Sequence, residues 1–160
     1  MPRCWELTRA APADIAPLAA LESHCFDWPW GRLSFEGELS AAGADNRVAW
    51  AGACGEKRIV GYIFFRFIAE EVHIFRIAVD PAWRRRGIGA RLLAECLNAA
   101  RAEGMAAAVL EARPSNTEAM ELYRKFGFRV LATRPGYYSD RQEDALILKR
   151  TLTQKEELWP

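Results

Sequence analysis

The sequence contains one segment whose residue types and spacing suit a specific chemistry, a basic turn that runs from Asp80 to Ala90. Three consecutive arginines, Arg84–Arg86, are followed there by Gly87 and Gly89. Guanidinium groups form charge-assisted hydrogen bonds with anions, and glycine lets the backbone come close to a ligand. If a helix starts at this turn, its unpaired N–H groups and partial positive charge add to the attraction. The segment therefore predicts a phosphate cradle, although a solvated basic helix start fits the spacing equally well.

Other known modes of anion binding fit this turn less well. It lacks the Gly-Lys-Ser/Thr ending of a P-loop and the G-x-G-x-x-G fingerprint of dinucleotide-binding proteins. Arg84–Arg86 could contact nucleic acid, but no second basic patch or interleaved aromatic residues accompany the run. With 22 basic and 21 acidic residues, the chain also lacks the bulk charge for such binding. We therefore expect no direct contact with nucleic acid.

Length and composition fit one α/β domain of ordinary size, since the chain has 160 residues of which 51% are hydrophobic. No apolar run approaches the ~20 residues of a membrane span, and the N-terminus lacks the apolar core of a signal peptide. We expect a cytoplasmic protein with no membrane partner. Four scattered cysteines without a C-x-x-C pair, Cys4, Cys25, Cys54 and Cys96, predict idle or buried thiols and no metal site.

The elements before the basic turn follow from the hydrophobic period, which is helical first and then changes to that of strands. The three strands are consecutive, so we expect them to pair in antiparallel fashion. In order, we expect an edge strand at 3–9, a helix that opens at Ala13-Asp14, a short helix at Ser34–Leu39 capped by Ser34, a hairpin of strands at 47–54 and 58–68, and a third strand at 72–79.

After Pro81 the period becomes helical again and then alternates. An apolar stripe of five residues predicts a helix that ends at Gly104, and a short apolar strand at 107–112 would complete a βαβ crossover. The stripe consists of Leu92, Leu93, Cys96, Leu97 and Ala100. The remaining expected elements are a helix opened by a Ser115/Glu118 capping box and ended by Gly127, strands at 128–133 and 145–148 around a polar stretch at 134–144, and a tail at 153–160 without clear structure. Residues 1–152 then form one mixed α/β domain.

Two motifs in this order resemble those of the GNAT acetyltransferases. The first is Arg84-x-x-Gly87-x-Gly89 after Ile77-Ala78-Val79-Asp80-Pro81. The second runs from Leu110-Glu111-Ala112-Arg113-Pro114-Ser115-Asn116 through Ala119 and Leu122-Tyr123 to Gly127-Phe128. The resemblance covers roughly residues 58–150. It implies a mixed sheet of about six to seven strands flanked by about four helices, and transfer of an acetyl group from acetyl-CoA to an amine, with no metal.

Within that family the chain most resembles the bacterial ribosomal-protein-alanine N-acetyltransferases of the RimI type. Three segments carry this resemblance: Cys25-Phe26-x-x-Pro29-Trp30, Leu110-Glu111-Ala112-Arg113, and Arg134-Pro135-Gly136-Tyr137-Tyr138 followed by Glu143-Asp144-Ala145. The acceptor that this implies is the N-terminal α-amine of a small-subunit ribosomal protein, an alanine.

The resemblance also implies the roles of single residues. Glu111 stands at the end of an otherwise apolar strand and would remove the amine's proton through water, whereas its ordinary role would be to pair with Arg113 or to lie in solvent. Tyr123 would protonate the departing sulfur, although a lone tyrosine at helical spacing is usually a core residue. Asn116 would hydrogen-bond the pantetheine arm of the cofactor or simply cap a helix. A backbone N–H at or beside Val79 would stabilise the oxyanion.

The expected cofactor-binding residues come from both motifs, with Arg85 left between solvent and the 3′-phosphate of CoA. They are Ile77, Ala78, Val79, Arg84, Arg85, Arg86, Gly87, Ile88, Gly89, Ala90, Asn116 and Tyr123. A second set, Trp30, Glu71, His73, Tyr137 and Tyr138, could contact the acceptor. Each of these also has an ordinary structural reading: Trp30 as packing, Glu71 as a solvated strand start, His73 as a structural histidine and the two tyrosines as core.

The sequence leaves other functions open. The same fold could serve a polyamine, an antibiotic or a lysine side chain, and we expect the loops at 25–40 and 134–144 to decide between these acceptors. A non-catalytic module that binds acetyl-CoA is a different class, and the presence of both Glu111 and Tyr123 argues against it.

Overall fold

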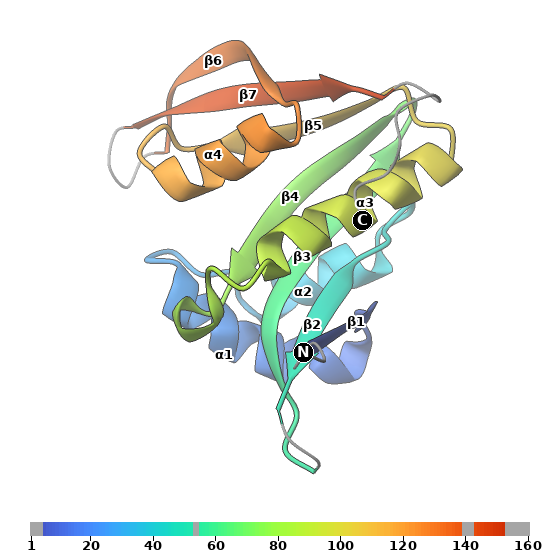
Figure 1. Cartoon of the computed structure of the whole chain (residues 1–160), viewed down its shortest axis with the longest axis vertical. Helices are drawn as coiled ribbons and strands as arrows, with labels where there is room; N and C mark the ends of the chain where they lie inside the picture. The colour runs from blue at the N-terminus through green and yellow to red at the C-terminus, as the bar shows by residue number, and fades with distance from the viewer. Residues whose placement is uncertain (1–4, 53–54, 139–142, 153–160) are drawn as a thin grey trace.

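The chain folds around a seven-stranded sheet with the strand order β1-β2-β3-β4-β5-β7-β6 (Figure 1). The structure is a computed structural model that describes residues 5–52, 55–138 and 143–152. All neighbouring strands are antiparallel except β4 and β5, which are parallel. The strands are β1 Trp5–Arg9, β2 Arg47–Ala51, β3 Arg58–Ile68, β4 Glu71–Val79, β5 Ala107–Ala112, β6 Arg129–Tyr138 and β7 Glu143–Thr151.

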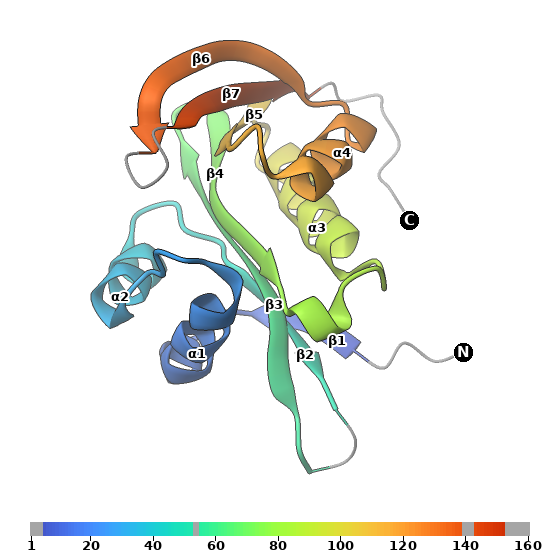
Figure 2. The same cartoon turned by 90° about the vertical axis from the view of Figure 1, so that its left-hand side faces the viewer.

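Helices cover both faces of this sheet. Helices α1 (Ile15–Cys25) and α2 (Arg32–Ser40) pack on one face, and α3 (Ile88–Ala102) and α4 (Thr117–Lys125) on the other (Figure 2). Each face has its own apolar core, because alternate side chains of a strand point to opposite sides. The mixed α/β sheet and its flanking helices confirm the predicted fold class.

Helix α3 provides the crossover between the two parallel strands. Its apolar stripe is buried against the sheet, and the helix is followed by Gly104, whose φ of +71° suits a residue without a side chain. Strand β5 then returns parallel to β4, as the predicted βαβ unit requires. The antiparallel β2–β3–β4 meander is likewise confirmed.

Two local predictions are wrong. Ser34 does not cap α2, because the helix begins at Arg32 and Gly31 occupies the N-cap. The Ser115/Glu118 capping box does not form either. Ser115 instead donates from its N–H and its hydroxyl to the two carboxylate oxygens of Glu143, at 2.8 and 2.9 Å. A charged acceptor from β7 makes the stronger hydrogen bond, so the cap passes to the next residue, Asn116.

The C-terminal strands are also longer than the predicted runs at 128–133 and 145–148. Strand β6 continues to Tyr138 through residues that read as a polar stretch. It lies at the edge of the sheet and is exposed along nearly its whole length, which is where charged residues suit a strand. The first hairpin strand is shorter than predicted, ending at Ala51, and the predicted tail at 153–160 lies outside the described residues.

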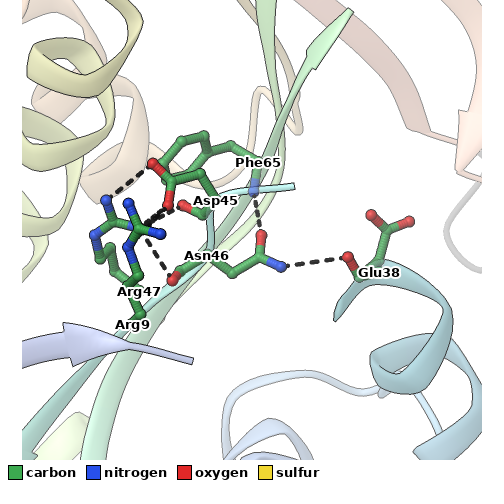
Figure 3. Close-up of polar contacts among 6 residues, drawn as sticks. All are labelled: Arg9, Glu38, Asp45, Asn46, Arg47 and Phe65. Carbon is green, nitrogen blue, oxygen red and sulfur yellow. Dashed lines mark hydrogen bonds and ion pairs between the residues drawn. The ribbon is translucent and has the colours of Figure 1, made fainter. Parts of the chain in front are cut away.

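A polar cluster joins α2, β2 and β3 at a bulge in the central sheet (Figure 3). The side chain of Asn46 accepts a hydrogen bond from the Phe65 N–H at 2.9 Å and donates one to the Glu38 carbonyl at 3.3 Å. Asp45 beside it forms ion pairs with Arg47 and Arg9. The register between β3 and β4 shifts next to Phe65, so this cluster supports the sheet where β4 changes direction.

Within the described residues, no helix combines the length and the apolar character that crossing a membrane requires.

Candidate active site

The basic turn connects the end of β4 to α3 with an unusual backbone. Arg85 has φ +63° and Gly87, the N-cap of α3, has φ +79°. Left-handed residues among right-handed ones turn successive N–H groups toward a common point, an arrangement that suits anions. Arg84 donates from Nε to the Val79 carbonyl at 3.1 Å, which fixes the start of the turn against the strand. The turn therefore presents backbone donors and the N-terminus of a 15-residue helix in one place.

A cavity of about 630 Å³, here called the turn cavity, lies between this turn and α4. Its walls come from β4, the turn, the first residues of α3 and one side of α4. They include nearly all the predicted cofactor-binding residues, namely Ile77, Ala78, Val79, Arg84, Arg85, Gly87, Ile88, Gly89, Ala90, Asn116 and Tyr123. Arg86 is the exception: its guanidinium lies 4.6 Å from the centre of the Trp83 ring.

The two parallel strands separate beside this cavity. Their pairing ends where Ile74 lies opposite Leu110, and the next residue of β4, Phe75, is the extra residue of a bulge opposite Phe64 and Phe65 of β3. A bulge bends a strand and adds twist, so β4 runs away from β5 toward the lower strands (Figure 1). The edge of β4 that faces β5 is open from there on.

A second cavity of about 540 Å³, here called the strand cavity, opens where β4 and β5 part. Its walls come from the α1–α2 loop, β4, β5, the start of α4 and the end of β6. They include Asp27, Trp28, Phe75, Arg76, Glu111, Arg113 and Tyr138. The cavity thus combines acidic, basic and aromatic side chains that are far apart in the sequence.

The turn cavity and the strand cavity share one wall. The residues that line both are Cys25, Phe26, Ile77, Asn116, Ala119 and Tyr123. A ligand in the turn cavity and a second ligand in the strand cavity would therefore meet at this wall. Such an arrangement suits a transfer reaction between two bound molecules.

Glu111 lies on the strand cavity and has two polar partners from β6. Its Oε1 is 3.1 Å from Nη1 of Arg134, so the carboxylate is paired with this arginine. Arg113, the partner in its ordinary structural reading, is 3.7 Å from Glu143. Tyr137 also hydrogen-bonds to Glu111, which raises the pKa of the tyrosine because the carboxylate favours its protonated form. Residue Gly136, with φ +61°, turns the strand between the two partners, and its N–H donates to Asp144 at 2.7 Å. The irregular end of β6 thus aims two side chains at one carboxylate.

Tyr123 occupies the shared wall and is 5% exposed. Burial raises the pKa of its phenol far above the usual value, and nearby Tyr138 adds to this rise. Its ring packs edge-on against Phe128. The phenol therefore stays protonated at any ordinary pH, as a proton donor must before it acts.

Asn116 also lines both cavities, and it caps α4 by accepting a hydrogen bond from the Ala119 N–H at 3.2 Å. Of its two predicted roles, the helix cap is therefore the one that is observed directly.

Three predicted acceptor residues, Trp30, Glu71 and His73, do not line either cavity. Trp30 packs edge-on against Phe35 and Phe64 in the core below α1 and α2. Glu71 pairs with Lys149, and His73 is 3.3 Å from Glu71. Glu71 and His73 precede the bulge in β4, so they lie on the part of this strand that is still paired with β5.

The two tyrosines at the end of β6 differ in position. Tyr138 lines the strand cavity, with the Arg113 guanidinium 3.9 Å from its ring centre. Tyr137 does not line it, but it hydrogen-bonds to Glu111 and its ring packs edge-on against that of Tyr138.

Sequence reasoning missed a buried ion pair next to the strand cavity. Glu22 on α1 is fully buried and pairs with Arg76 on β4, which lines the cavity. Trp28, which is 69% exposed, also lines it. The signal for Glu22 was present: it follows Ile15 by seven residues and Leu18 by four, so it belongs to the apolar face of its helix.

The sequence profile of the Acetyltransferase (GNAT) family matches residues 15–128 of this chain. The chain belongs to the acetyltransferase (GNAT) family. It is an N-acetyltransferase of that family, whose members take their acetyl group from acetyl-CoA.

Two sequence relatives of this acetyltransferase differ in length. The N-alpha-acetyltransferase RimI of Mycobacterium tuberculosis is 37% identical over 150 residues, which cover 90% of this chain and 89% of the relative. A longer uncharacterized protein of Mycobacterium leprae is 39% identical over 145 residues, and the aligned part covers 87% of this chain. The match spans only 38% of the length of that longer protein.

Among solved structures, the acetyltransferase is similar to the crystal structure of the ribosomal-protein-S18-alanine N-acetyltransferase from Escherichia coli. The TM-score is 0.84 at 26% sequence identity, and the match covers 96% of this chain and 97% of the other. The predicted family and the predicted sheet are both confirmed by these similarities.

Proposed function

We propose that this acetyltransferase transfers the acetyl group of acetyl-CoA to the N-terminal α-amine of a protein, with the alanine of a small-subunit ribosomal protein as its acceptor. The observation that supports this most is the shared wall, where a cavity with a basic turn meets a second cavity that carries a carboxylate. The M. tuberculosis relative, named an N-alpha-acetyltransferase, and the E. coli protein, named a ribosomal-protein-S18-alanine N-acetyltransferase, support the choice of acceptor. An acceptor of that kind would place the enzyme in the cytoplasm.

The turn cavity has the features that the phosphates of CoA need. The left-handed backbone at Arg85 and Gly87 aims N–H groups at one point, and Gly89 adds no side chain there. Arg85 and Lys125 line the same cavity and add positive charge. Asn116 lies farther along the wall, where the pantetheine arm would pass.

The open edge of β4 supplies a donor for the oxyanion. The Val79 carbonyl accepts from Arg84 and from the Cys25 thiol at 3.6 Å, so it faces the gap between the strands. In an extended strand the N–H and C=O of one residue point to the same edge, and the Val79 N–H therefore faces the gap as well. A donor held there before the reaction stabilises the charge that develops on the thioester oxygen.

Glu111 and Tyr123 divide the proton transfers. A free α-amine has a pKa of about 7.7–8.0, so much of it is protonated at neutral pH and cannot attack. Glu111 removes this proton through a water molecule, and the neutral nitrogen forms a bond to the acetyl carbon. As the carbon–sulfur bond breaks, Tyr123 gives its proton to the sulfur. The nitrogen loses its second proton as the amide forms, and this proton passes through water to the phenolate, while the proton on Glu111 returns to solvent. The raised pKa of Tyr123 keeps the donor loaded before each turnover.

Mass spectrometry of acetylated peptides tests the proposal directly. The protein is incubated with acetyl-CoA and a peptide that begins with alanine, beside the same peptide with a blocked N-terminus and an internal lysine. Spermidine and an aminoglycoside complete the panel. We expect one acetyl group on the free alanine peptide and none on the blocked peptide. Acetylation of the small amines or of lysine alone would reject the proposed acceptor while leaving the acetyltransferase activity intact.

A further inference from the structure

A carboxylate without access to solvent lies one layer behind the strand cavity. Glu22 on α1 has an exposed fraction of 0%, and Ile15, Leu18 and Leu21 of the same helix belong to the apolar core. Its Oε1 accepts hydrogen bonds from Arg76 and from the Trp30 N–H at 2.8 Å. Its Oε2 is buried and has no hydrogen-bond partner within the described part of the chain. A buried carboxylate is costly unless its charge is balanced, so Glu22 depends on Arg76.

Arg76 connects this carboxylate to the strand cavity. It follows the bulge that separates β4 from β5, and its side chain points toward α1. Nε and Nη2 both donate to Glu22, the first at 2.9 Å, and Nη2 also donates to the Trp28 carbonyl at 3.1 Å. The guanidinium lies 3.7 Å from the centre of the Phe26 ring. The guanidinium also lies 5.3 Å from the centre of the Trp30 ring, so one arginine contacts three residues of the α1–α2 loop.

The segment between α1 and α2 lacks helical or strand structure of its own, yet Phe26, Asp27 and Trp28 form one wall of the strand cavity. A loop on the surface needs contacts that fix it if it is to present a defined wall. Here the loop has a ring stacked on Arg76, a carbonyl bonded to Arg76 and the Trp30 N–H bonded to Glu22.

We propose that Glu22 and Arg76 are positioning residues that set this wall and thereby the affinity for the acceptor amine. They act through the loop and touch no reacting atom. The proposal rests on the proposed function only in that the acceptor occupies the strand cavity. The anion-binding turn is formed by Arg84–Gly89, outside this network, so binding of acetyl-CoA should depend on it much less.

Steady-state kinetics of Glu22→Gln test this inference, with both substrates varied. The amide keeps the shape of the side chain and an oxygen for the Trp30 N–H, but it loses the charge that holds Arg76. We expect the KM for the alanine peptide to rise at least tenfold, while kcat and the KM for acetyl-CoA change less than about threefold. Glu36→Gln removes the exposed i,i+4 pair with Arg32 and is the matched control, which should leave all three values unchanged.

A second variant covers the case in which Glu22→Gln does not fold, as judged by its thermal transition. Arg76→Lys keeps the balancing charge but loses the planar stacking on Phe26 and the fork of two donors. It should show the same split between the two KM values. A folded variant with an unchanged acceptor KM, or with kcat and both KM values changed alike, would overturn the inference. The acetylation assay on the wild-type protein tests the proposed function separately. The KM values for the acceptor and for acetyl-CoA can be compared in the variants with whichever amine the wild type acetylates.

Discussion

The turn cavity and the strand cavity share a wall, but they are built in different ways. Most of the turn cavity comes from one continuous segment, from Ile77 to Ala90, and its main feature is backbone geometry. The strand cavity takes its walls from five separate parts of the chain, and its features are side chains held by partners elsewhere. Binding in the turn cavity should therefore depend on single backbone positions, and the chemistry of the strand cavity on networks of interacting side chains. The predictions below test that difference.

The largest effect is expected at Glu111, the carboxylate of the strand cavity. Glu111→Gln removes the base and should lower kcat by about 10²–10⁴-fold, the range typical of general base catalysis. Affinity for acetyl-CoA, measured by calorimetry, should stay within about twofold of that of the wild type, since Glu111 does not line the turn cavity. Glu103→Gln, an exposed glutamate that lines neither cavity, is the matched control and should leave both values unchanged. An unchanged kcat would remove Glu111 from the mechanism.

The next effect concerns the turn cavity alone. A Cβ at Gly89 would lie 3.6 Å from side-chain atoms of Leu122 and Val79, which is ordinary van der Waals contact, so Gly89→Ala should bind acetyl-CoA normally. An indole at this position is far larger than a methyl group, so it would extend into the turn cavity and occupy the space of the phosphates. Gly89→Trp should weaken binding of acetyl-CoA at least about 100-fold, or ~2.7 kcal/mol. Tight binding by a correctly folded Gly89→Trp protein would show that the turn does not hold the phosphates.

This difference also explains what the sequence could predict. The strands, the crossover and the turn follow from local periods and from glycine, so β5 and its helix-strand connection match their predictions closely. Glu71 and His73 looked equivalent to later residues of the same strand, because no sequence pattern reveals the bulge that separates them from the cavity. Glu22 is missing from the prediction for a related reason: its partner Arg76 is 54 residues away and only the folded sheet brings them together.

A smaller effect should arise from the network around Glu111. Arg134→Gln removes the cation 3.1 Å from this carboxylate. Both side chains are partly exposed, so the pair contributes ~1 kcal/mol at most, and kcat/KM should fall about fivefold. Arg129→Gln, on the exposed start of β6, is the control and should leave kcat/KM unchanged.

The smallest effect is expected at the wall that both cavities share, and it is one of stability. The pKa of Tyr123 is higher in the folded protein than in the unfolded chain because the phenol is buried. Above pH 10 the unfolded chain releases this proton while the folded protein keeps it, so the free energy of unfolding falls as the pH rises. At pH 10.5 one such phenol should cost about 0.8 kcal/mol relative to pH 8.

Tyr123→Phe lacks this group, so urea unfolding at the two pH values should show a smaller loss of stability than in the wild type. Tyr137→Phe serves as a comparison because that phenol is half-exposed, and its pKa is raised mainly by Glu111. Equal losses of unfolding free energy in the wild type and in Tyr123→Phe would mean that solvent reaches the phenol. The wall shared by the two cavities would then not exclude water at the place where the two ligands meet.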